Sequence, residues 1–423
     1  MKRIFQIIES NKVLFKNFTS LSILQITNYI FPIITLPYLV RILGPEKYGL
    51  INFAAAFTSY FTILTDYGFN LSATQEISVN RNDKQKVSEI FSSVITSKLL
   101  LYFLSTIVFF SCLISFDIFK TDNALFLISY AGLIGTVIFP LWYFQGTEKM
   151  IFIFIINFVI KLITVILIFL LIKNPADYLL LVIIYSTSQV VYGLTGLITV
   201  IKKFKVQLFL TNIGNIFNQF RKSKNIFMSS LSISVISSSN VFILGLFVDK
   251  STVGYFAAAD KIRLAFQSML GPLFTTTFPH VSNLAKKSFG QFYNFNKKSF
   301  FFTFTFSLLI FLIIFWNAEI LVEIVLGNGY ENSIIILKTL SVIPFLYSIS
   351  NFLGVQILLP LNYSKKYATI MFFALIVHTS FALILANYFQ AVGSAIAIIV
   401  AEIFTIILLL ISLIKIKTDM VYK

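Results

Sequence analysis

Ionisable side chains lie inside apolar segments of this 423-residue chain that are each long enough to cross a membrane. A charge in hydrocarbon is costly unless it faces protein or water, so each of these side chains is a candidate functional group. Cations outnumber carboxylates in the set, and Lys and Arg are the natural counter-charges of an anion such as a diphosphate. The set consists of the cations Arg41, Lys98, Lys161, Lys261, Arg263 and Lys338 and the carboxylates Asp66, Asp260 and Glu402.

Depth within the segments ranks the cations. At 1.5 Å per residue, Lys161 lies about 16 Å into its segment, near the midplane, and Lys98 about 12 Å in. Asp260, Lys261 and Arg263 lie roughly 9–14 Å in from the other side. A long side chain can reach the headgroups from near an interface, but less easily from the midplane. Lys161 is therefore the strongest candidate for contact with an anion.

The other cations have structural alternatives. Lys98 could extend to the headgroups, and Arg41, at the end of its segment, could anchor there. Lys338, about 10 Å in, is a weaker candidate still. Arg263 and Lys261 could join Asp260 in an ion pair that orients helices, although we expect at least one of these cations to face a cavity.

Three carboxylates and one histidine could carry ions or protons. Asp66 falls close to an interface, and we favour a backbone N–H or an arginine partner for it over ion coupling. Asp260 and Glu402 are the other candidates for coupling. Glu402 and His378 could relay protons. For both residues we favour a packing role in which the polar atoms are hydrogen-bonded.

Composition places most of the chain in lipid. Hydrophobic residues make up 57% of the sequence and charged residues 12%, whereas soluble domains are about a quarter charged. The single Cys112 provides neither a disulfide framework nor a thiol metal site, and two distant histidines exclude a histidine-built metal centre. We expect no cofactor, and the net charge of +16 reflects membrane topology rather than nucleic-acid binding.

The apolar runs predict twelve membrane spans with both termini in the cytoplasm. Loops rich in Lys and Arg stay inside, and alternate loops with the two termini carry 23 of the 33 Lys and Arg, against 5 in the intervening loops. The expected spans are 18–41, 48–74, 90–116, 123–145, 150–172, 178–201, 225–248, 254–281, 299–317, 331–358, 366–388 and 392–414.

A basic stretch, 202–224, divides the spans into two sets of six. The expected organisation is a bundle over 1–201, a cytoplasmic linker on the membrane surface, and a second bundle over 225–423. Six spans per half predict a parallel repeat. A trace of it is present, because KYGLINFAAAF at 47–57 resembles TVGYFAAAD at 252–260.

Four motifs together resemble one family. They are RILGPEKYG from Arg41, DYGFNLSATQEIS from Asp66, WYFQGTEKM from Trp142, and the stretch from GNGYENS at Gly327 to Tyr367. The chain resembles Wzx-type O-antigen or capsular polysaccharide repeat-unit flippases, of the polysaccharide transporter family in the MATE-like MOP superfamily. The resemblance implies two six-helix bundles around a central cavity and a bacterial inner-membrane location. It also implies an undecaprenyl-diphosphate-linked oligosaccharide as substrate, with a polysaccharide polymerase and a chain-length regulator as partners.

These implications assign roles to the candidates. Lys161, Arg263, Lys261, Lys98 and Arg41 would be cavity cations that contact the diphosphate. Ion coupling would fall to Asp66, Asp260 and Glu402.

Two other classes are open at this stage. A MATE-type drug or metabolite antiporter shares the fold, but its cavity usually favours acidic residues. A membrane-embedded polymerase would need a catalytic constellation on a long outer loop, and the outer loops here are short. No P-loop occurs, so ATP does not drive the process directly, and we expect a transporter rather than an enzyme. The sequence leaves the sugar composition and the energy source undetermined.

Overall fold

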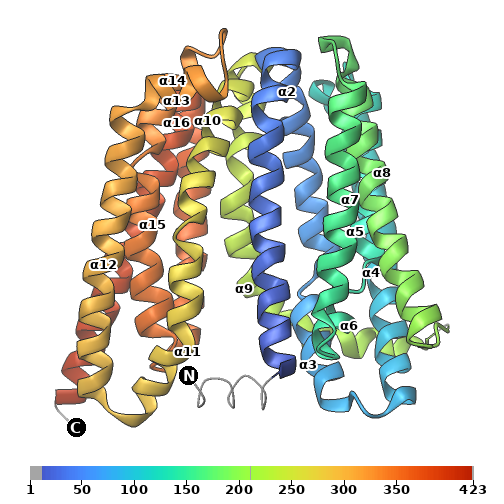
Figure 1. Cartoon of the computed structure of the whole chain (residues 1–423), viewed down its shortest axis with the longest axis vertical. Coiled ribbons are helices and arrows are strands. Elements are labelled where there is room, and N and C mark those ends of the chain that lie inside the picture. The colour runs from blue at the N-terminus through green and yellow to red at the C-terminus, as the bar shows by residue number, and fades with distance from the viewer. Residues whose placement is uncertain (1–11, 210, 422–423) are drawn as a thin grey trace. The chain divides into compact units, whose positions relative to one another are not determined.

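The computed structural model describes residues 12–209 and 211–421, and every regular element within those ranges is a helix (Figure 1). The side chains of residues 12–22, 26, 29, 225, 228–230, 232–233, 237 and 416–421 lie outside this description. The predicted all-α class is confirmed. Residues 1–11 lie outside the described residues.

The chain divides into two compact units, Met1–Tyr38 with Ala54–Leu231, and Leu39–Phe53 with Ser232–Lys423. The expected bundles were 1–201 and 225–423. The observed units differ from them in two stretches. Residues 39–53 group with the second unit, and residues 202–231, which are the expected linker and the start of the expected second bundle, group with the first.

The first unit contains a series of helices joined by short connections. They are α2 (Lys12–Asp66, without its stretch 39–53), α3 (Phe69–Asn80), α4 (Lys84–Ser115), α5 (Asn123–Ile138), α6 (Leu141–Gly146), α7 (Met150–Leu171) and α8 (Tyr178–Ile198). Single turns of 3-10 helix lie at Asp117–Phe119 and Pro175–Asp177, and a π-helical turn at Thr199–Lys203. Helix α9 (Ile213–Phe247) begins in this unit and continues into the other.

The second unit contains the remaining helices. They are α10 (Lys250–Ser268), α11 (Gly271–Lys287), α12 (Phe289–Trp316), α13 (Ala318–Val325), α14 (Asn332–Leu340), α15 (Ile343–Asn351), a π-helical stretch at Phe352–Leu358, and α16 (Ser364–Val421).

Proline explains why three of the expected spans are broken. Pro140 precedes α6, and Pro272 and Pro344 lie in the first turns of α11 and α15. Proline lacks the N–H that a continuing helix requires, but it is tolerated in a first turn. Each of the expected spans 123–145, 254–281 and 331–358 therefore contains a break between two helices.

A break of another kind ends the second expected span early. Tyr67 (φ 44°) and Gly68 (φ 75°) have left-handed conformations, and α2 stops at Asp66. Conversely, two expected pairs of spans each appear as one long helix with a single non-helical residue, Gly44 in α2 and Gln390 in α16. Each of these residues falls in the expected gap between two spans.

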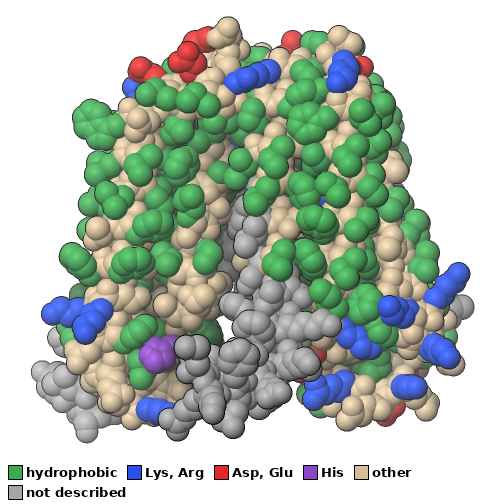
Figure 2. Space-filling view, viewed as in Figure 1, with side chains coloured by type: hydrophobic (Ala, Val, Ile, Leu, Met, Phe, Trp, Pro, Cys, Tyr) green, Lys and Arg blue, Asp and Glu red, His purple; other side chains and the backbone are tan. Residues whose placement is uncertain are grey.

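By length and apolar composition, eight helical segments of the described residues are candidates to cross a membrane. Two of them, Ile23–Asn80 and Ser364–Lys415, contain 58 and 52 residues, each enough for two crossings at about 20 residues per crossing. The chain is therefore a multi-pass membrane protein, while the count of twelve stays a prediction. In Figure 2, hydrophobic side chains cover the middle of the face shown, and Lys and Arg of the first unit gather at the end where α3 and α6 lie.

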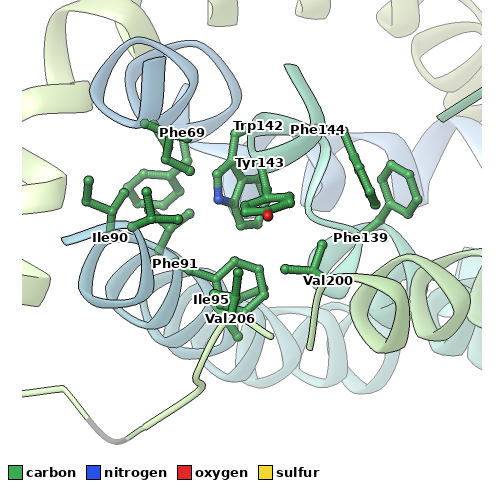
Figure 3. Packing of buried hydrophobic residues seen from close by; sticks show 14 of the residues in the cluster. Phe69, Ile90, Phe91, Ile95, Phe139, Trp142, Tyr143, Phe144, Val200 and Val206 are labelled. Atoms are coloured by element: carbon green, nitrogen blue, oxygen red, sulfur yellow. The ribbon is translucent and has the colours of Figure 1, made fainter. Parts of the chain in front are cut away.

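The core of the first unit is aromatic at that end. Trp142, Phe69, Phe91 and Phe144 are fully buried, and Figure 3 shows Trp142 and Tyr143 enclosed by side chains of α3 and α4. Aromatic residues bury large areas, so this cluster fixes the short helix α6 against its neighbours.

Glycine contacts hold residues 39–53 in the second unit. A Cβ added to Gly49 would lie 1.8 Å from the carbonyl oxygen of Lys250 and 2.5 Å from the amide nitrogen of Gly254. These two glycines belong to the two copies of the short repeat. The copies therefore meet, and their backbones approach closely because neither residue has a side chain.

Candidate functional site

Lys98 and Asp66 form a buried ion pair in the first unit. The Lys98 side chain lies within the protein, 3% exposed, with its Nζ 3.5 Å from Asp66 Oδ1 and 5.0 Å from the ring centroid of Trp142. The partner of Asp66 is thus a lysine, where we expected a backbone N–H or an arginine. Lys98 contacts protein groups rather than extending to a headgroup. The contact with Trp142 was not predicted from the sequence.

Lys161 makes a different contact, on α7 of the same unit. It is half-buried, and its Nζ donates a hydrogen bond to Asn28 Oδ1 on α2 at 2.6 Å. Among the described residues it makes no ion pair within 4.0 Å. Within the described part of the chain, its charge is therefore not offset by a carboxylate, which favours contact with an anion. Asn28 was not identified from the sequence.

Arg263 lies in a charged group of the second unit. Its side chain is buried, and its Nε donates to Asp260 Oδ1 at 2.7 Å. Nη1 donates to Gln267 Oε1. Glu402 of α16 interacts electrostatically with Arg263 and accepts a 2.6 Å hydrogen bond from the hydroxyl of Ser350. The structure therefore pairs Asp260 with Arg263 one turn apart on the same helix, α10.

The remaining cations are at the surface of the second unit. Lys261 is exposed, although it neighbours buried Arg263 in sequence. Arg41 is also exposed, and its Nη2 donates to the carbonyl oxygen of Ile324 near the end of α13. Lys338 pairs with Glu319 at 3.0 Å. The candidate cations are thus divided between the units, Lys98 and Lys161 in one and Arg41, Lys261 and Arg263 in the other.

His378 has a satisfied polar environment. It is fully buried, with Nε2 3.0 Å from Asn240 Oδ1 and Nδ1 3.5 Å from the hydroxyl of Ser239. Within the described part of the chain, no group of three or more His, Cys, Asp and Glu residues could hold a metal ion.

The motifs that began at Asp66 and Trp142 meet in the first unit. The hydroxyl of Thr74 lies 3.2 Å from Gln145 Oε1, and Arg81, three residues after the motif from Asp66, pairs with Glu148 of the motif from Trp142 at 2.9 Å. A Cβ on Gly146 would lie 2.9 Å from the carbonyl oxygen of Thr74. These motifs therefore encode the packing of α3 on α6.

The other two motifs meet in the second unit. A Cβ on Gly327, which has a φ of 82°, would lie 3.0 Å from Nε of Arg41. In the same loop, Glu331 Oε1 accepts a hydrogen bond from the amide of Gly329 at 3.0 Å. That bond favours the carboxylate form and lowers the pKa of Glu331. The four motifs are thus two pairs of contacting segments.

The fold belongs to a known class of membrane transporters. A lipid II flippase, MurJ, in an inward closed conformation matches with a TM-score of 0.73 and 15% identity over 94% of this chain and 87% of that one. An inward-facing multidrug resistance MATE family transporter of the MOP superfamily matches with a TM-score of 0.69 and 14% identity, over 92% and 98%. At these identities the likeness concerns the fold.

The sequence comparisons show the family. The chain belongs to the polysaccharide biosynthesis protein family, whose model matches residues 14–285. A relative from Escherichia coli (strain K12) is 32% identical over 92% of this chain and 93% of its own length. One from Shigella dysenteriae is 29% identical over 93% and 98%. Both are named "Putative O-antigen transporter", so the relatives are described as transporters rather than catalysts, and the resemblance to the flippase family is confirmed.

Proposed function

We propose that this protein is a flippase that moves undecaprenyl-diphosphate-linked oligosaccharide repeat units from the cytoplasmic to the periplasmic leaflet. The observation that carries the proposal is the likeness, over more than nine-tenths of the chain, to relatives named as O-antigen transporters. The fold shared with a lipid II flippase supports it. A headgroup of this size cannot cross a permanently open pore without ion leakage, so the protein works by alternating access.

Lys161 is the residue that best suits the diphosphate. It lies about 16 Å into its span, and its described partner is the neutral amide of Asn28. Arg263 and Lys98 each have a carboxylate partner, so the substrate would have to compete with that partner. Lys261 and Arg41 are exposed and contribute less specific attraction.

The setting follows from the same proposal. The protein lies in the bacterial inner membrane with both termini in the cytoplasm, and it works beside a polysaccharide polymerase and a chain-length regulator. Asp66, Asp260 and Glu402 are the candidates for ion coupling. The repeat units belong to O-antigen or to capsule.

A MATE-type antiporter for cationic compounds is the second candidate, because it shares the fold. The cation Lys161, without a described carboxylate partner, disfavours it, since a cationic substrate would be repelled there.

Complementation tests the two candidates. In a strain lacking its own repeat-unit flippase, we expect the intact chain to restore surface polysaccharide made from a matching repeat unit, as measured on gels of the polysaccharide. An empty vector and a chain truncated after residue 201 are the controls. Drug resistance without restored polysaccharide would favour the antiporter and contradict the flippase.

A further inference from the structure

One face of α3 carries three residues spaced by four: Gly68 at its N-terminus, Ser72 and Glu76. Residues at this spacing lie above one another on a helix. All three belong to the second motif, and none of them has a part in the function proposed above.

Helix α9 presents a matching face to it. Gln219, Lys222, Ser223, Ile226 and Phe227 follow the three-and-four spacing of a single helical stripe. Gln219 and Ser223 are 4% and 0% exposed. Polar side chains are rarely so buried unless they are hydrogen-bonded.

The contacts between the two faces run in antiparallel register. Lys222 Nζ lies 2.6 Å from Glu76 Oε1, and Gln219 Nε2 donates to Glu76 Oε2 at 3.2 Å. The hydroxyls of Ser72 and Ser223 are 2.6 Å apart.

The register continues at the start of α3. A Cβ on Gly68 would lie 2.9 Å from Cγ2 of Ile226. Beside it, the ring of Tyr67 stacks on that of Phe227 at 4.4 Å. Positions closer to the N-terminus of α3 thus contact positions closer to the C-terminus of α9.

The chain that leads into α9 is also held by this unit. The hydroxyl of Ser88 accepts a hydrogen bond from the amide of Gln207, and that of Ser92 from the amide of Phe209, both at 3.2 Å. Val206 is 7% exposed. The two ends of the expected linker therefore pack on α4 and α3.

We infer that Glu76 is a positioning residue for transport: through Lys222 and Gln219 it fastens the first turns of α9 to the first unit throughout the transport cycle. This inference rests on the proposed flippase function. The fastening makes Ile213–Phe227 a rigid part of the first unit. Motion between the units then passes through α9 beyond Phe227, and 202–224 is not the hinge.

A disulfide between positions 72 and 223 tests whether the fastening persists. In a Cys112→Ser background, we expect Ser72→Cys/Ser223→Cys to cross-link efficiently in inverted membrane vesicles treated with copper phenanthroline, since the two hydroxyls are in contact. The vesicles should then translocate a radiolabelled prenyl-diphosphate-linked sugar at a rate within about twofold of the reduced sample. The two single cysteine variants are controls for oxidant damage.

Charge reversal tests the role of Glu76. We expect Glu76→Lys and Lys222→Glu each to reduce both the cross-linking yield and translocation at least fivefold. The double variant Glu76→Lys/Lys222→Glu should recover most of both, because the pair is re-formed with opposite sense. Lys224→Glu, which makes the same charge change at an exposed position two residues away, should leave both unchanged.

The outcomes separate the inference from the function on which it rests. Loss of translocation on cross-linking, reversed by dithiothreitol, would mean that α9 must leave α3 and would overturn the inference. Equally, failure of the double variant to recover cross-linking would remove Glu76 from this role. Efficient cross-linking and charge rescue in a chain that never translocates the lipid-linked sugar would count against the proposed function instead.

Discussion

Lys161 is the buried or half-buried candidate cation without a carboxylate partner in the described part of the chain. A charge-assisted hydrogen bond contributes about 2 kcal/mol, which corresponds to about thirtyfold in affinity. We therefore expect Lys161→Ala to reduce surface polysaccharide about tenfold or more at an unchanged protein level, with Lys161→Arg retaining more activity. Lys84→Ala, at an exposed position of the same unit that is not among the candidate cations, is the matched control. Wild-type polysaccharide levels in the Lys161→Ala strain would exclude this residue from the substrate site.

At the same scale, the sequence identified which side chains are unusual but not what they contact. A charged residue inside an apolar run is visible from the sequence alone, and this criterion identified Lys98, Lys161 and Arg263. Asn28, the partner of Lys161, and Trp142, the partner of Lys98, lie on other helices and far away in the sequence. Helix rotation and packing decide such contacts, and a single sequence does not specify them.

At the scale of elements, hydropathy found where helices lie but not where they break. Breaks depend on local backbone chemistry, at Pro140, Pro272 and Pro344 and at the left-handed pair Tyr67–Gly68. A proline is a visible break signal in a sequence, whereas Tyr67 gives no such signal, because a left-handed tyrosine is uncommon. Gly68, Ser72 and Glu76 are spaced by four and so lie on one face of a helix. From this spacing, a packing partner for that face could have been predicted, although not which helix provides it.

The contact between Gly49 and Gly254 makes an element-scale prediction. Gly49→Ala places a Cβ where the backbone of Lys250 and Gly254 already lies, so the helices must separate. Overpacking of this kind costs typically 1–3 kcal/mol, and we expect a lower Tm in detergent, measured by fluorescence-detected chromatography after heating. Gly290→Ala, with no atom within 4 Å of the added Cβ, should keep or raise the Tm, because alanine favours a helix. Equal Tm values for the two variants would show that the close approach does not contribute to stability.

At the scale of the whole molecule, the uneven distribution of Lys and Arg among the loops and the positions of the helical breaks indicate one membrane topology. The stretches with 23 of the 33 Lys and Arg alternate with stretches that carry 5. Loops rich in Lys and Arg are retained in the cytoplasm. The helical breaks at Gly44 and Gln390 fall in two of the poorly charged stretches, where the chain would reverse at the outer surface. We expect reporter fusions after residues 82, 148, 212, 290, 364 and 420 to report cytoplasm, and fusions after 45, 120, 175, 251, 329 and 390 to report periplasm, as read by paired alkaline phosphatase and green fluorescent protein reporters. Position 212 is decisive, because it precedes α9, whose first turns pack on α3. A periplasmic result there would reverse the second half of the topology and contradict the arrangement of two halves that both begin in the cytoplasm.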